Sequence, residues 1–209
     1  MQAQPSPKDE FVFAVLLFCS TIPYNEVISV FLVERLGPFL ALACAAVYCI
    51  TLYMRAGKAP GRDWLAWFPV PLTLSVGAAG LGVATALLIT YLGYHPTHNL
   101  IRPAPLAAKM IIATTIGPLW EELLTRGLLF RALSGNHATP RRAIIAVLVA
   151  ALMFSLAHLD KDWVGRMWAF ASGCAYGWIR LASRSTIPAV IAHQFYNITV
   201  YNVFRLILR

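Results

Sequence analysis

Two adjacent carboxylates and a guanidinium, Glu121, Glu122 and Arg126, lie inside a long apolar stretch of the sequence, residues 106–133. An ionisable group is costly in lipid, so its presence in such a stretch marks a functional site by default. If 106–133 is helical, Glu122 and Arg126 share one face, and Glu121 is rotated from Glu122 by about 100°. We therefore expect Arg126 to neutralise Glu122 and Glu121 to point elsewhere, available as a general base.

Two further polar pairs follow in later apolar segments with the same four-residue spacing. His158 comes four residues after Phe154, and His193 comes four residues before Asn197. Peptide hydrolysis needs a base that activates water and hydrogen-bond donors for the oxyanion that develops. The chain contains a full set of such groups, namely Glu121, His158, His193 and Asn197.

The same side chains also permit a metal site. Two histidines and a glutamate form a common zinc ligand set that leaves one position open for water. The HExxH spacing of many zinc peptidases is absent, however, and all ligands would come from separate helices. We therefore favour a site without cofactor or metal, and we keep zinc as the less favoured alternative.

Composition indicates a membrane protein. The chain has 209 residues, of which 59% are hydrophobic and 12% charged. A soluble domain of this length carries about twice that share of charge. The net charge of +8 comes from Lys and Arg in short loops and at helix ends, as in membrane anchoring. Because no basic stripe with interleaved aromatic residues occurs, we expect no nucleic-acid partner.

The apolar runs predict an all-α, polytopic bundle of about seven transmembrane helices in a single membrane domain, 1–209. A spanning helix needs about 20 mostly apolar residues. The predicted spans are 11–33, 39–54, 70–94, 106–133, 143–159, 164–181 and 187–208. Simple alternation of these spans places His158 and His193 near opposite membrane surfaces. The two histidines can meet only if some helix is short, tilted or broken.

Three motifs, in order on successive apolar segments, resemble a known family. They are Glu-Glu-x-x-x-Arg, Phe-x-x-x-His and His-x-x-x-Asn. Together they are similar to the CPBP family, the CAAX-protease and bacteriocin-processing (Abi) group of intramembrane proteases. The resemblance covers a catalytic core at 106–202, whereas the N-terminal spans, 11–94, carry no motif that we can match.

The resemblance implies a glutamate-dependent, glutamic-type intramembrane peptidase. In this chain Glu121 and His158 would activate the water, and His193 and Asn197 would form the oxyanion hole. The supporting residues would be Glu122, Arg126 and Phe154. The expected substrate is a membrane-associated protein or peptide, such as a prenylated CaaX tail, a leader peptide or a C-terminal sorting tail, and the expected location is a bacterial inner membrane.

Two non-proteolytic alternatives remain open. The first is a membrane immunity or scaffold protein that keeps the fold without catalysis. The second is a small proton-coupled transporter that uses Glu26, Glu121, His158 and His193 as a relay. Transporters usually show repeated halves, and this sequence shows none.

Overall fold

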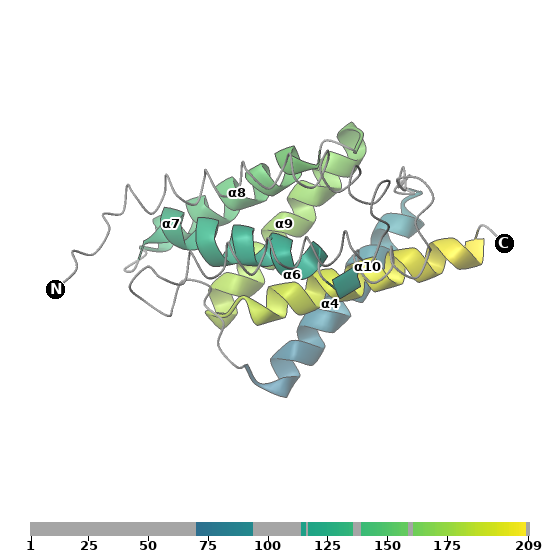
Figure 1. The fold of residues 1–209 in the computed structure, drawn as a ribbon, viewed down its shortest axis with the longest axis horizontal. Helices are drawn as coiled ribbons and strands as arrows, with labels where there is room; N and C mark the ends of the chain where they lie inside the picture. Colours follow the sequence, from purple (N-terminus) through teal and green to yellow (C-terminus); the bar gives the residue numbers. More distant parts are fainter. Residues whose placement is uncertain (1–69, 94–113, 116, 136–138, 159–160, 208–209) are drawn as a thin grey trace, which may run out of the picture.

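The computed structural model describes residues 70–93, 114–115, 117–135, 139–158 and 161–207 (Figure 1). Its described elements are all helical: α4 (Leu72–Tyr91), α6 (Gly117–Glu122), η3 (Leu123–Leu129), α7 (Phe130–Ser134), α8 (Pro140–Ala157), α9 (Trp163–Ser183) and α10 (Ile187–Ile207). The predicted spans 11–33 and 39–54, and Glu26, lie outside the described residues. Within the described part, the prediction of an all-α fold is confirmed.

The motif-bearing segment forms a continuous helical rod of α6, η3 and α7 that lies between other helices (Figure 1). Its α6 end contacts α10, and its η3 and α7 parts contact α8. Helix α8 packs along α9, and α10 packs along α4. Because the rod touches both pairs of helices, side chains from α8, α9 and α10 can reach the same few residues of the motif.

The rod is not the regular α-helix that the apolar run predicts. Residues Leu123–Leu129 form a π-helix of seven residues, and the N–H of Phe130 donates to the carbonyl of Thr125, five residues earlier. Such wide turns are rare and are frequently found at functional sites. The expectation of a regular α-helix is therefore wrong across this stretch, although Glu122 and Arg126 keep their four-residue spacing.

Local capping explains where α8 and α9 begin. The Thr139 hydroxyl accepts from the N–H of Arg142, and Pro140 occupies the first turn, so α8 starts three residues before the predicted Ala143. Asp162 accepts from the N–H of Gly165 at 2.8 Å and caps α9. These caps set the register of both helices and hence the positions of the side chains on them.

Two of the described helices, α4 and α8, are long and apolar enough to cross a membrane. One side of α8 presents large apolar side chains outward, and spacings of mostly three or four residues keep them on one face. These residues are Ile144, Ile145, Leu148, Leu152 and Leu156. An outward apolar face of this kind suits contact with lipid. The described structure thus agrees with a helical membrane protein, and the number of seven spans stays a prediction.

Candidate active site

Glu122 and Arg126 form the buried ion pair that their spacing predicts. Nη1 of Arg126 lies 3.0 Å from Oε1 of Glu122, and both side chains have zero exposure. Nη1 also donates to the hydroxyl of Thr125, and Nη2 donates to the carbonyl of Gly173 at 2.9 Å. Arg126 therefore neutralises the buried carboxylate and at the same time ties η3 to α9.

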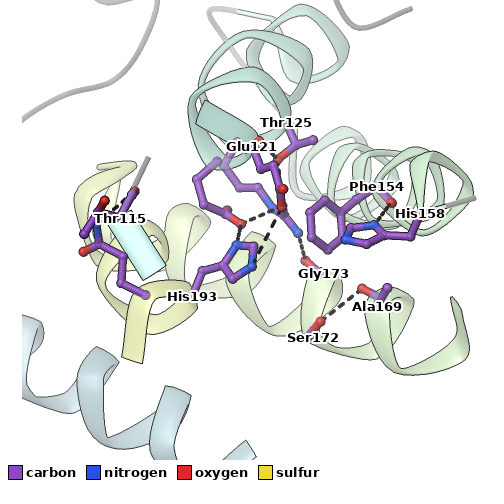
Figure 2. Close-up of polar contacts among 12 residues, drawn as sticks. Thr115, Glu121, Thr125, Phe154, His158, Ala169, Ser172, Gly173 and His193 are labelled. Carbon is purple, nitrogen blue, oxygen red and sulfur yellow. Dashed lines mark hydrogen bonds and ion pairs between the residues drawn. The ribbon is translucent and has the colours of Figure 1, made fainter. Parts of the chain in front are cut away.

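The imidazole of His193 lies against both glutamates of the motif, and Figure 2 shows it facing Glu121. Its Nδ1 is 2.9 Å from Oε1 of Glu122, and its Nε2 is 3.8 Å from Oε2 of Glu121. An ionised carboxylate only accepts hydrogen bonds, so Nδ1 carries the proton that is shared with Glu122. This arrangement directs Nε2, the nitrogen available for chemistry, toward Glu121.

The two adjacent glutamates have different surroundings. The side chain of Glu121 is 32% exposed, whereas that of Glu122 is fully buried. The hydroxyl of Thr125 donates to the carbonyl of Glu121 at 2.6 Å and holds the backbone at this residue. Glu121 is thus the carboxylate that a substrate or water can reach, and Glu122 is the carboxylate that organises its neighbours.

His158 caps the C-terminal end of α8 and contacts the Phe154 ring edge-on, with ring centroids 4.5 Å apart. Its Nδ1 lies 2.8 Å from the carbonyl oxygen of Phe154. Because a carbonyl only accepts, Nδ1 carries a proton and Nε2 is the basic nitrogen of the neutral ring. One turn of α8 therefore sets both the position and the tautomer of His158.

Phe154 joins the two histidines that simple alternation of spans would separate. Its ring centroid is 5.8 Å from that of His193 and 4.5 Å from that of His158 (Figure 2). The guanidinium carbon of Arg126 lies 4.6 Å from the same ring. Both histidines contact the same ring because α8 and α10 both reach the motif-bearing rod.

Asn197 lies on α10, four residues after His193, and is partly buried. Residues at this spacing share a helix face, so its amide is on the side of α10 that carries His193. The role of Asn197 at an oxyanion stays a prediction, as do the catalytic roles of the other predicted residues.

Sequence reasoning missed Tyr176. Its ring stacks on His193 with centroids 5.3 Å apart and an interplanar angle of 25°, and it lies 5.6 Å from the Arg126 guanidinium carbon. The only sequence signal is a bulky residue next to a glycine, Gly177, in a helix with a second glycine at Gly173. Such a pattern is typical of close helix packing and does not by itself indicate a site.

Three buried polar atoms at this site have no hydrogen-bond partner within the described residues. They are Oε2 of Glu122, Nε of Arg126 and the hydroxyl oxygen of Tyr176. Native proteins leave few such groups unsatisfied, and those that occur call for a specific explanation such as a catalytic role. Their grouping around one ion pair makes this region the candidate functional site.

The described ranges contain no group of three or more His, Cys, Asp or Glu side chains arranged to hold a metal ion. The prediction of a site without metal therefore stays a prediction, and zinc remains its alternative.

Residues 103–199 match the family described as Type II CAAX prenyl endopeptidase Rce1-like. No curated protein and no solved structure matches the chain. The matched segment contains Glu121, Glu122, His158 and His193, the residues on which the expected resemblance depended. The resemblance is therefore confirmed over the matched segment, residues 103–199, which is similar to the Type II CAAX prenyl endopeptidase Rce1-like family.

Proposed function

We propose that this protein is an intramembrane endopeptidase of the glutamic type. The observation that carries the proposal is that the partly exposed carboxylate of Glu121 lies next to the imidazole of His193, which is fixed by its hydrogen bond to Glu122. Glu121 is 32% exposed and lies 3.8 Å from Nε2 of His193, whose other nitrogen is bound by the buried Glu122. A carboxylate and a histidine arranged in this way serve proton transfer and charge stabilisation, the two needs of peptide hydrolysis.

In the proposed reaction, Glu121 removes a proton from a water molecule, and the hydroxide attacks the carbonyl carbon of the scissile bond. The oxyanion that forms accepts hydrogen bonds from His193 and Asn197. When the tetrahedral intermediate collapses, the C–N bond breaks, and the leaving nitrogen takes the proton from Glu121. The base is thereby restored to its carboxylate form, and one water molecule has been consumed.

The histidines have distinct parts in this scheme. To donate from Nε2, His193 must hold a second proton beside the one on Nδ1, and the carboxylates of Glu121 and Glu122 on its two sides compensate that charge. His158, with its Nδ1 proton directed to Phe154, presents a basic Nε2 that can accept a hydrogen bond from the attacking water. Neither role requires a metal, and we propose that none is used.

The proposed substrate is a membrane-anchored or lipid-linked protein cut near the membrane surface. The candidates are a prenylated CaaX tail, a leader peptide and a C-terminal sorting tail, and the proposed location is a bacterial inner membrane. The family match at 103–199 supports proteolysis of such a substrate without naming it.

A comparison of membrane and secreted peptides tests the proposal. Hosts would carry the wild type, Glu121→Gln or Asp162→Asn, with protein levels matched by immunoblot. Glu121→Gln keeps the side-chain shape and removes the base. Asp162→Asn removes one carboxylate of equal charge but preserves the cap of α9, because Asn caps a helix about as well as Asp.

We expect one protein or peptide to accumulate uncleaved with Glu121→Gln only. The new terminus that the wild type produces from it, and that Glu121→Gln does not, identifies the scissile bond. If the peptides from Glu121→Gln and wild type are the same while the variant is present and folded, the endopeptidase proposal fails. A scaffold or immunity protein of the same fold, which tolerates this change, would then be the better interpretation. Changes shared by both variants would indicate a general charge effect and would also count against Glu121 as the base.

A further inference from the structure

We propose that Tyr176 is a positioning residue that fixes the plane of the His193 imidazole through the face of its aromatic ring. This inference rests on the proposed function only in giving His193 a part in the reaction. Tyr176 belongs to none of the three sequence motifs, and it lies on α9, whereas the motifs lie on the rod, α8 and α10. A fourth element thus completes the site.

The contacts of His193 show why a further constraint is needed. The hydrogen bond from Nδ1 to Glu122 fixes the position of one ring atom. Besides its covalent bond to Cβ, the ring is fixed by this hydrogen bond at one atom only, and small rotations about χ1 and χ2 would still tilt it and carry Nε2 away from Glu121. Proton transfer depends on short, aligned contacts, so the plane of the ring matters as much as its anchor.

Two aromatic rings supply that constraint from different directions. Tyr176 stacks on the imidazole with an interplanar angle of 25°, and Phe154 meets it nearly at right angles, at 85°. Stacked and edge-on contacts at these separations are the favoured geometries for aromatic pairs. The face contact with Tyr176 opposes tilting of His193, and the edge contact with Phe154 opposes sliding.

Tyr176 is itself held in place by close helix packing. Its side chain is almost fully buried in a cluster with Ala78, Ala189 and Ala192 from α4 and α10. On its own helix, a methyl group added at Gly177 would lie 2.9 Å from a methyl carbon of Val147. Because α9 approaches α8 this closely, the Tyr176 ring has little room to move. The His193 ring that stacks on it is therefore also restricted in its motion.

The hydroxyl of Tyr176 gives the inference a sharp test. It is buried and has no hydrogen-bond partner within the described residues. The proposal assigns the positioning to the ring and not to the hydroxyl. Tyr176→Phe, which keeps the ring, should therefore behave like the wild type, whereas Tyr176→Leu, which removes the stacking face, should not.

The first measurement is NMR of the purified protein in detergent micelles, with ¹³C-labelled histidine. The chain has five histidines, and His193→Gln assigns the His193 signal by its loss. Ring protons above the face of a neighbouring aromatic ring shift upfield. We expect that upfield shift in the wild type and in Tyr176→Phe, and its loss in Tyr176→Leu. An unshifted His193 signal in the wild type overturns the inference, whether or not the leucine variant folds.

The second measurement is steady-state cleavage of a synthetic peptide. The peptide spans the scissile bond of the substrate that accumulates uncleaved with Glu121→Gln. A misplaced catalytic group lowers the rate with little effect on binding, so Tyr176→Leu should lower kcat by about ten- to a hundredfold with KM nearly unchanged. Tyr176→Phe should stay within about threefold of the wild type on the same reasoning. Equal losses in both variants would transfer the role to the hydroxyl and overturn the inference.

The two proposals fail in different ways. If Glu121→Gln cleaves as well as the wild type, the proposed mechanism is wrong, and the NMR result still decides whether Tyr176 holds His193. If Glu121→Gln is inactive and Tyr176→Leu is folded and fully active, only the role of Tyr176 is wrong.

Discussion

Oε1 of Glu122 lies 2.9 Å from Nδ1 of His193, a residue 71 positions later in the chain. The same oxygen receives Nη1 of Arg126 at 3.0 Å. One buried carboxylate oxygen therefore joins the motif-bearing rod to α10 and also forms the ion pair with the guanidinium of Arg126. Glu122 is more than the partner of Arg126, because it also sets the orientation of the imidazole that faces Glu121.

The shared oxygen leads to a prediction for the Glu122–Arg126 pair. Arg126→Met leaves the Glu122 carboxylate buried without its main countercharge, and removing one partner of a buried ion pair costs roughly 3–5 kcal/mol. Glu122→Gln combined with Arg126→Met removes the uncompensated charge, so the double variant should be more stable than Arg126→Met alone. The free energy of unfolding of the two single variants and the double variant, measured in detergent, checks this.

The contrary result is that the loss of unfolding free energy in the double variant equals the sum of the losses in Glu122→Gln and Arg126→Met. Residues in direct contact normally couple by about 0.5–3 kcal/mol, so additive losses would mean that the pair contributes no charge coupling to folding. The ion pair would then serve only to position Arg126 against Gly173.

Much of the helical architecture could be predicted from the sequence. The span expected at 164–181 is α9, Trp163–Ser183, and that expected at 187–208 is α10, Ile187–Ile207. Long apolar runs bounded by polar turns specify such helices without knowledge of their neighbours. The four-residue spacing likewise predicted the Glu122–Arg126 pair, because both residues lie on one helix.

The contacts between helices could not be predicted in this way. The pairing of Glu122 with His193 and the stacking of Tyr176 on His193 depend on how α9 and α10 pack against the rod. Periodicity shows which residues share a face of one helix and leaves the partner of that face unspecified. The π-helix at Leu123–Leu129 was missed for a related reason: its wide turn has no residue signature in the run Leu-Leu-Thr-Arg-Gly-Leu-Leu.

The proposed base predicts how activity depends on pH. Only the ionised form of Glu121 can take a proton from water, so the cleavage rate should fall as the pH is lowered from neutrality through the range in which carboxylates take up protons, below about pH 5. Initial rates across this range, with circular dichroism at each pH to confirm that the helices persist, provide the check. A flat profile with an intact fold would exclude Glu121 as the base.

The metal-free mechanism predicts resistance to chelation. The purified enzyme, dialysed against EDTA and checked for residual zinc by mass spectrometry, should cleave the peptide at the rate of the untreated enzyme. In the zinc alternative the metal activates the water, so its removal should abolish cleavage, and added Zn²⁺ should restore it. Loss of cleavage on chelation and its recovery with Zn²⁺ would mean that Glu121 is a zinc ligand and not the general base.

Two glycines of α4 offer a matched test of how this helix supports the site. A methyl group at Gly82 would collide with the carbonyl oxygen of Ala192, the residue before His193, whereas a methyl group at Gly80 meets no atom within 4 Å. Gly82→Ala should therefore lower the free energy of unfolding by about 1–3 kcal/mol, as overpacking does. It should also reduce cleavage, because α10 must shift away from α4 and carry His193 with it.

Gly80→Ala is the control, since it makes the same chemical change two residues earlier on the open side of α4. It should leave cleavage unchanged and raise the stability by up to about 1 kcal/mol, because alanine favours a helix more than glycine does. Thermal unfolding in micelles and peptide cleavage would be measured on both variants. Equal behaviour of the two would show that α4 does not press on α10 beside His193, and that this helix supports the membrane domain without setting the geometry of the site.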